Sequence, residues 1–350
     1  MKQKIDHIVL LRVIAIILVV LGHATRDIHF PNLHMYTPQT MACWELSARN
    51  YIYSFHMPLF FWISGFVFYF SIIENKKKRS VWNQIYRKFQ RLVIPLYITS
   101  FLVLLPTIFL FGHLNGSLLH QIKLFILAEN NDHLWFLKSL FIIFVIYIPL
   151  NHFKKSNSNL FYMIVIILWA VVYYNIQIMP NLFHEAMQYI LFFIIGCLSR
   201  KYEFSLNKIK YTISFSVLFL LHLILILFKS KVTLYLPDIL FYYLTAFSGI
   251  YYMYYFSKLI YKNLLHNKVW ITIKKLDVAS YSIYLFHVSF LYFILFINNK
   301  FNIDIPEVRI ALSFILGLIL PIYIHNLLSK NQILSKAFSI PFKQSSKIKK

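Results

Sequence analysis

The chain has 350 residues, of which 59% are hydrophobic and only 13% are charged. A soluble domain carries about a quarter charged residues, so this composition excludes an ordinary soluble protein, and the repeated long apolar runs indicate a polytopic membrane protein. With two cysteines and seven glycines, the sequence offers no disulfide framework, no cysteine metal cluster and no glycine-rich phosphate loop.

The first apolar run, 8–24, carries an arginine at position 12 and a histidine at position 23. A separation of eleven residues corresponds to about 1100° of helical rotation, so Arg12 and His23 share one face, roughly 16 Å apart along the axis. A guanidinium inside a span costs at least about 2.5 kcal/mol and normally faces the bundle interior. We therefore interpret the pair as two groups lining one internal cavity. The alternative is that Arg12 reaches the headgroups and His23 lies at the other interface.

The apolar runs predict an all-α, polytopic bundle of about ten transmembrane helices. An additional segment, 117–128, is apolar on one face only and is expected to lie at the outer interface. The predicted spans are 8–25, 51–73, 92–112, 134–151, 160–178, 187–199, 211–228, 237–257, 278–298 and 307–327.

The distribution of basic residues predicts that both termini are cytoplasmic. With that orientation, 27 of the 35 lysines and arginines lie on the inner side and 8 lie outside, Arg309 among the latter. This bias accounts for the net charge of +23 without a nucleic-acid partner. We divide the chain into a membrane domain, 1–330, and a basic cytoplasmic tail, 331–350.

A basic segment leads into the third predicted span. Arg87 and Arg91 are four residues apart and share a helix face, with Lys88 beside them. Such a cluster at the membrane surface can hold a polyphosphate group. The alternative is that these residues only set the topology.

Other chemically active side chains lie near or within the spans. His133 and Trp135 precede the fourth span and can bind a sugar ring, although an interfacial aromatic belt explains them equally well. His287 lies near the middle of the ninth span, where a histidine needs a partner. Ser64, next to Gly65, permits close approach of another helix. We group His133, Trp135, His287 and Ser64 as residues lining the pore or binding the acceptor.

Five blocks, in order, resemble the membrane-bound acyltransferase-3 family. They are LLRVIAIILVVLGH (with Arg12 and His23), FFWISGF (60–66), RKFQRLVIPLY (87–97), HLWFL (133–137) and YSIYLFH (281–287). The resemblance spans essentially the whole chain. It implies transfer of an acyl group, commonly acetyl from acetyl-CoA, to hydroxyls of cell-envelope glycans.

The resemblance also implies roles for individual residues. Arg12 and His23 would be the essential pair, and Arg87, Lys88 and Arg91 would serve the acyl-CoA end. The sequence departs from the family where an acid and a glycine are usual near the arginine. Val9 and Val13 stand there, which leaves Asp6 as the nearest acid.

These observations predict an integral membrane O-acyltransferase, with acetyl as the expected group, that moves the acyl group from acyl-CoA to a cell-surface or lipid-linked glycan. Neutral His23 suits the role of general base, and Arg12 suits a clamp on phosphate or carbonyl oxygen. Transfer through an acyl-histidine is the alternative.

We expect no permanently bound cofactor and no metal. A bacterial cytoplasmic membrane is the expected location. The rival functions are an exporter of polysaccharide or lipid-linked sugar and a scaffold for a polysaccharide synthase.

Overall fold

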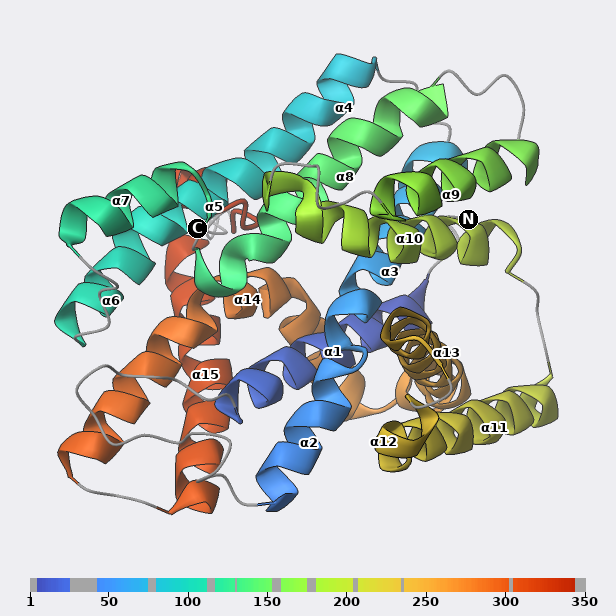
Figure 1. The fold of residues 1–350 in the computed structure, drawn as a ribbon. Helices are drawn as coiled ribbons and strands as arrows, with labels where there is room; N and C mark the ends of the chain where they lie inside the picture. The colour runs from blue at the N-terminus through green and yellow to red at the C-terminus, as the bar shows by residue number, and fades with distance from the viewer. Residues whose placement is uncertain are drawn as a thin grey trace, which may run out of the picture.

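The computed structural model describes residues 5–25, 43–74, 80–111, 117–129, 131–152, 159–174, 181–203, 207–233, 236–301 and 305–343. Within these ranges the chain is helical and contains no strand, which confirms the all-α prediction (Figure 1). The helical elements are, in chain order, α1 (Asp6–Ala24), α2 (Cys43–Tyr53), α3 (His56–Phe68), η1 (Tyr69–Glu74), α4 (Val81–Lys88), η2 (Phe89–Val93), α5 (Ile94–Thr99), η3 (Ser100–Leu104), α6 (Leu105–Leu110), α7 (Leu118–Ile126), η4 (Asp132–Leu134), α8 (Trp135–His152), α9 (Asn159–Tyr174), α10 (Asn181–Lys201), α11 (Lys208–Leu227), α12 (Lys229–Val232), α13 (Asp238–Leu264), α14 (Lys268–Lys300), α15 (Pro306–Leu328) and α16 (Gln332–Ala337).

Each of the ten predicted spans overlaps a helix, but the described residues include only seven helical segments that are long and apolar enough to cross a membrane. The segments that qualify are Asp6–Ala24, Trp44–Ile72, Val81–Leu110, Asp132–His152, Lys208–Leu227, Lys268–Asn298 and Pro306–Leu328. Helix α9 is short, α10 has polar residues at both ends, and α13 is rich in tyrosine, so these three do not qualify. The count of ten spans and the cytoplasmic termini remain predictions.

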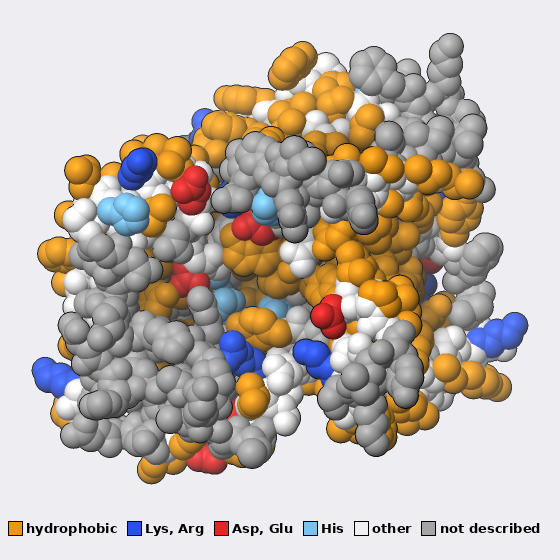
Figure 2. All heavy atoms as spheres, viewed as in Figure 1, with side chains coloured by type: hydrophobic (Ala, Val, Ile, Leu, Met, Phe, Trp, Pro, Cys, Tyr) orange, Lys and Arg blue, Asp and Glu red, His pale blue; other side chains and the backbone are white. Residues whose placement is uncertain are grey.

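Helix α1 lies inside the bundle and packs against α2, α3, α13, α14 and α15 (Figure 1). Most of its apolar side chains are buried, with Leu11 and Val20 each 0% exposed. By contrast, α11 presents Ile213, Val217 and Leu227 outward. Hydrophobic side chains cover much of the surface in Figure 2, as expected for a protein surrounded by lipid.

The prediction that Gly65 permits close helix approach is confirmed by the contact between α3 and α10. A Cβ atom at Gly65 would lie 1.9 Å from the Phe193 carbonyl oxygen, and one at Gly196 would lie 2.1 Å from the Trp62 carbonyl oxygen. The two helix backbones therefore meet at a point where neither residue tolerates a side chain.

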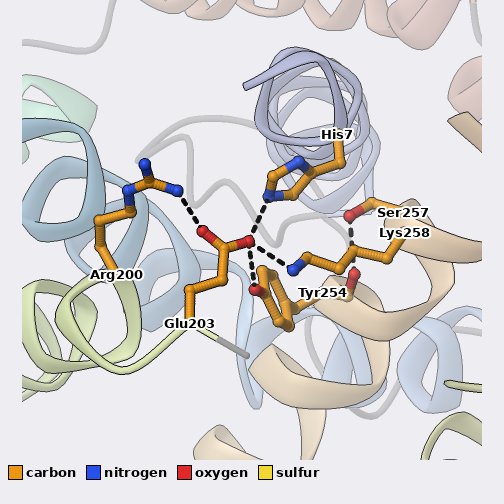
Figure 3. Close-up of polar contacts among 6 residues, drawn as sticks. All are labelled: His7, Arg200, Glu203, Tyr254, Ser257 and Lys258. Atoms are coloured by element: carbon orange, nitrogen blue, oxygen red, sulfur yellow. Dashed lines mark hydrogen bonds and ion pairs between the residues drawn. The ribbon is translucent and has the colours of Figure 1, made fainter. Parts of the chain in front are cut away.

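A cluster around Glu203 fixes the beginning of α1 (Figure 3). Glu203, just after α10, accepts a hydrogen bond from the Tyr254 hydroxyl at 3.0 Å and lies 3.3 Å from His7 Nε2. Arg200 and Lys258 form ion pairs with the same carboxylate. Burial alone would raise the pKa of Glu203, but the contacts with His7 and Lys258 outweigh it and lower this pKa. The carboxylate thus joins the first turn of α1 to α10 and α13.

Candidate active site between α1 and α14

Arg12 forms a two-pronged contact with Asp277 of α14. Its Nε and Nη2 atoms donate to Asp277 Oδ1 and Oδ2 at 2.5 and 2.9 Å. The acid that the sequence lacks beside Arg12 is therefore supplied by another helix. The pair is not sealed, because the Arg12 side chain is 32% exposed and that of Asp277 is 16% exposed. Within the described part of the chain, Arg12 Nη1 makes no hydrogen bond and is available to a further anion or oxygen.

His23 lies against two other histidines that come from distant parts of the chain. Its ring centroid is 5.1 Å from that of His287 in α14 and 6.3 Å from that of His133 in η4. The rings of His133 and His287 are 5.0 Å apart. The structure therefore brings together three histidines that lie far apart in the sequence.

The contacts of Arg12 and His23 show that α1 and α14 run in the same direction side by side. Arg12 precedes His23 by eleven residues, and Asp277 precedes His287 by ten. Each pair therefore spans about 15–16 Å of helix. The result is a site with two levels: an arginine–carboxylate level near the start of α1 and an imidazole level near its end.

The hydrogen bonds of His287 determine which of its nitrogens carries the proton. Nδ1 lies 2.9 Å from the carbonyl oxygens of Ile283 and Tyr284, both acceptors, so it must be the donor. In the neutral ring Nε2 then has a lone pair. Nε2 is buried and has no hydrogen-bond partner among the described residues. His287 therefore offers a fixed acceptor nitrogen inside the bundle.

Helix α14 also holds His133 in place. The Tyr284 hydroxyl donates to the His133 carbonyl oxygen, and His133 Nε2 lies 3.3 Å from the Leu285 carbonyl oxygen. The Tyr292 hydroxyl donates to Asp132 in the same turn. The short element η4 is thus attached to α14 at several points, which keeps its histidine beside His23.

Figure 2 shows a hollow in this face of the molecule, over α1 and α14, with histidine side chains at its bottom and hydrophobic side chains around it. His23 itself is only partly buried, whereas His133 and His287 are buried. The imidazole level is therefore reachable from outside. A hollow of this kind, apolar with a few converging polar groups, is typical of a small-molecule site.

The basic segment leading into the third predicted span divides into two kinds of residue. Arg87 and Arg91 are exposed. The Lys88 ammonium instead lies 3.7 Å from the centroid of the Phe144 ring and 5.9 Å from that of Phe68, directed into the bundle. The two arginines are thus placed to meet a ligand, whereas Lys88 makes cation–π contacts with the core.

Arg91 contacts α14, the helix that also carries Asp277, the partner of Arg12. The Tyr281 hydroxyl donates to the Arg91 carbonyl oxygen at 2.6 Å. Tyr281 follows Asp277 by one turn of α14, about 6 Å. Helix α14 therefore brings the arginine of α1 and the arginine of η2 to adjacent turns.

Trp135 and Ser64 lie among different neighbours. The Trp135 ring is half-buried, 5.3 Å from that of Tyr189 and 6.2 Å from that of Phe61. It stands two residues after His133 in the chain. The Ser64 hydroxyl donates to the Phe60 carbonyl oxygen of its own helix at 2.8 Å.

Sequence reasoning missed the partners on α14 and one buried ion pair. Asp277, Tyr281, Tyr284 and His287 are spaced so that they form one stripe, and only His287 was singled out from the sequence. The block YSIYLFH and this spacing were the available signal. Arg309, which was counted only among the outer basic residues, forms an ion pair with Glu45, and both side chains are buried. Among the described residues, no group of histidine, cysteine and acidic side chains is arranged to hold a metal ion.

Comparison with known proteins gives one match. A family model described as an acyltransferase domain, that of the acyltransferase-3 family, matches residues 5–326. No curated protein and no solved structure matches the chain. The matched range includes every residue of the two-level site between α1 and α14.

Proposed function

The chain belongs to the acyltransferase-3 family, and on that premise we propose that it is a membrane O-acyltransferase that moves an acyl group from acyl-CoA to a hydroxyl of a cell-surface or lipid-linked glycan. Acetyl is the expected acyl group, and a bacterial cytoplasmic membrane is the expected location. The observation that supports this most strongly is the two-level site, because it joins an anion-binding end to an imidazole end within one bundle.

The donor end is the arginine level. The Arg91 backbone contacts α14 at Tyr281, one turn after Asp277, the partner of Arg12, and the exposed Arg87 precedes Arg91 by four residues. Guanidinium groups recognise phosphate by paired hydrogen bonds, and CoA carries a diphosphate and a 3′-phosphate. With the predicted orientation, this end faces the cytoplasm, where acyl-CoA is made.

The chemical step belongs to the imidazole level. His23 removes the proton from the acceptor hydroxyl while that oxygen attacks the thioester carbonyl carbon. The carbon–sulfur bond then breaks, and the CoA thiolate leaves and takes up a proton. The pantetheine arm bridges the two levels, so that the thioester reaches His23 while the nucleotide stays at the arginines.

The neighbours of His23 fit this role. His287 and His133 surround it with imidazoles rather than carboxylates, and their own hydrogen bonds go to backbone carbonyls of α14. The acceptor sugar is expected to enter the hollow beside Trp135. An acyl-histidine intermediate on His23 is the alternative path.

The test is mass spectrometry of envelope glycans from cells that carry either the wild-type protein or His23→Ala. Wild type should add an acetyl mass, and His23→Ala should reduce acylation by about 10²–10⁴-fold, the usual contribution of a general base. His266→Ala, at an exposed turn after α13, is the matched control and should leave acylation unchanged. Full acylation by a folded, membrane-inserted His23→Ala protein would refute the catalytic assignment.

A further inference from the structure

The third long helical segment changes its hydrogen-bonding pattern where the basic residues stand. It continues from Val81 to Leu110, but it is π-helical over η2 (Phe89–Val93). Pro95 follows η2 and has no N–H, so the Arg91 carbonyl four residues earlier has no α-helical donor. A π-helical turn of this kind leaves carbonyl groups that need other partners.

Two hydroxyl groups from distant parts of the chain reach this turn. The Tyr281 hydroxyl donates to the Arg91 carbonyl oxygen at 2.6 Å, and the Ser339 hydroxyl donates to the Gln90 carbonyl oxygen at 3.0 Å. The donors stand 190 and 249 residues away along the chain from their acceptors. Adjacent carbonyls of one turn are therefore held from α14 on one side and from the C-terminal segment on the other.

The C-terminal segment is built to present Ser339. Asn331 caps α16, because its side chain accepts from the backbone N–H groups of Ile333 and Leu334. Ser339 itself has φ 52°, a left-handed conformation that a serine adopts only where its surroundings require it.

Backbone and ring contacts fix the rest of this segment. Ile340 N–H donates to the Ser335 carbonyl oxygen at 2.7 Å, and Lys343 N–H donates to the Ser329 carbonyl oxygen at 2.9 Å. Phe338 is buried, with its ring 5.4 Å from that of Phe286 in α14. The part of the predicted basic tail up to residue 343 is thus packed onto the bundle.

We propose that Tyr281 and Ser339 are positioning residues for the acyl-CoA phosphates: they hold the π-helical turn so that the Arg87 and Arg91 side chains project outward. This inference rests on the proposed function, because it takes those arginines as the donor-binding end. It assigns the C-terminal segment 332–343 a part in donor binding, although no side chain of that segment needs to touch the donor.

The experiment is isothermal titration of the purified full-length protein with CoA and with pantetheine, which lacks every phosphate. Tyr281→Phe and Ser339→Ala each remove one hydroxyl, and each should raise the Kd for CoA about 3- to 10-fold, the loss expected for one hydrogen bond. The Kd for pantetheine should not change. Tyr323→Phe, which removes an exposed hydroxyl on α15, is the matched control and should bind CoA like wild type.

The outcomes separate this inference from the proposed function. If Arg91→Ala weakens CoA binding while Tyr281→Phe and Ser339→Ala do not, the positioning role is wrong and the donor site stands. Equal loss of CoA and pantetheine binding would also overturn it, because it would reveal a general structural role. If the wild-type protein binds no CoA, the donor assignment fails together with the inference.

Discussion

Two arginine–carboxylate pairs lie at opposite ends of α1, and they differ mainly in exposure. Arg12 pairs with Asp277 and keeps 32% of its side-chain surface exposed, whereas Arg309 and Glu45 are 1% and 0% exposed. Arg309 also donates to the carbonyl oxygen of Ala24, the last residue of α1, at 3.3 Å. The same kind of ion pair therefore serves two purposes. The partly exposed Arg12–Asp277 pair can also bind a ligand, whereas the buried Arg309–Glu45 pair can only hold helices together.

The two pairs should consequently fail in different ways. Loss of a sealed pair leaves an uncompensated buried charge, which costs stability. Loss of an accessible pair lets water solvate the remaining group, so the fold is little affected while ligand binding suffers.

The largest effect is expected from Arg309→Ala. It leaves Glu45 buried without its cation, and removal of one partner of a buried pair costs about 3–5 kcal/mol of folding free energy. The thermal midpoint of the detergent-purified protein should fall sharply, while activity per folded molecule persists. The double variant Arg309→Met with Glu45→Leu should recover much of that stability, because both charges are gone. A thermal midpoint unchanged in Arg309→Ala would mean that the pair does not fasten α15 to α2.

Arg12→Ala should have the opposite result, a loss of activity with little loss of stability. We expect activity to fall about 10²–10³-fold, as when one preorganised donor to a reacting group is removed, with a thermal midpoint close to wild type. Arg12→Lys should also lose most activity, because an ammonium cannot donate to Asp277 and to a ligand in the same planar geometry. Acyl transfer measured at saturating acyl-CoA provides the readout. Normal turnover in Arg12→Lys would show that only the charge matters.

Asp277→Asn should have the smallest effect of the three. The amide keeps the shape of the carboxylate but loses one charge-assisted hydrogen bond, worth about 1.5–3 kcal/mol, so we expect a loss of activity of about 10- to 150-fold. The loss should appear together with weaker CoA binding in the same titration. An unchanged rate and affinity would indicate that Arg12 is oriented by groups other than α14.

The sequence could predict what depends on one helix alone. Helical periodicity placed Arg12 and His23 on one face, and both lie against α14. Periodicity could not predict the partners of the two arginines, because Asp277 stands 265 residues from Arg12 and Glu45 stands 264 residues from Arg309. Such pairings depend on how helices pack, and local pattern carries no information about that.

The same limit applies to the surroundings of the basic residues and to the helices that the apolar runs predict. Arg309 was counted among the outer basic residues, and its ion pair with Glu45 could not be predicted because the two residues are remote in sequence. Lys88 was grouped with Arg87 and Arg91, although the phenylalanines beside it come from α3 and α8. For α13, tyrosines such as Tyr243 and Tyr252 are buried in the bundle, so an average hydropathy underestimates how well that helix is accommodated.

The parallel pairing of α1 with α14 has a consequence for biosynthesis. Ribosomes make the first helix long before the ninth predicted span, so Arg12 enters the bilayer without Asp277. The nascent chain must carry that cation until most of the protein has been translated. The arginine–carboxylate level of the site is therefore completed only late in synthesis.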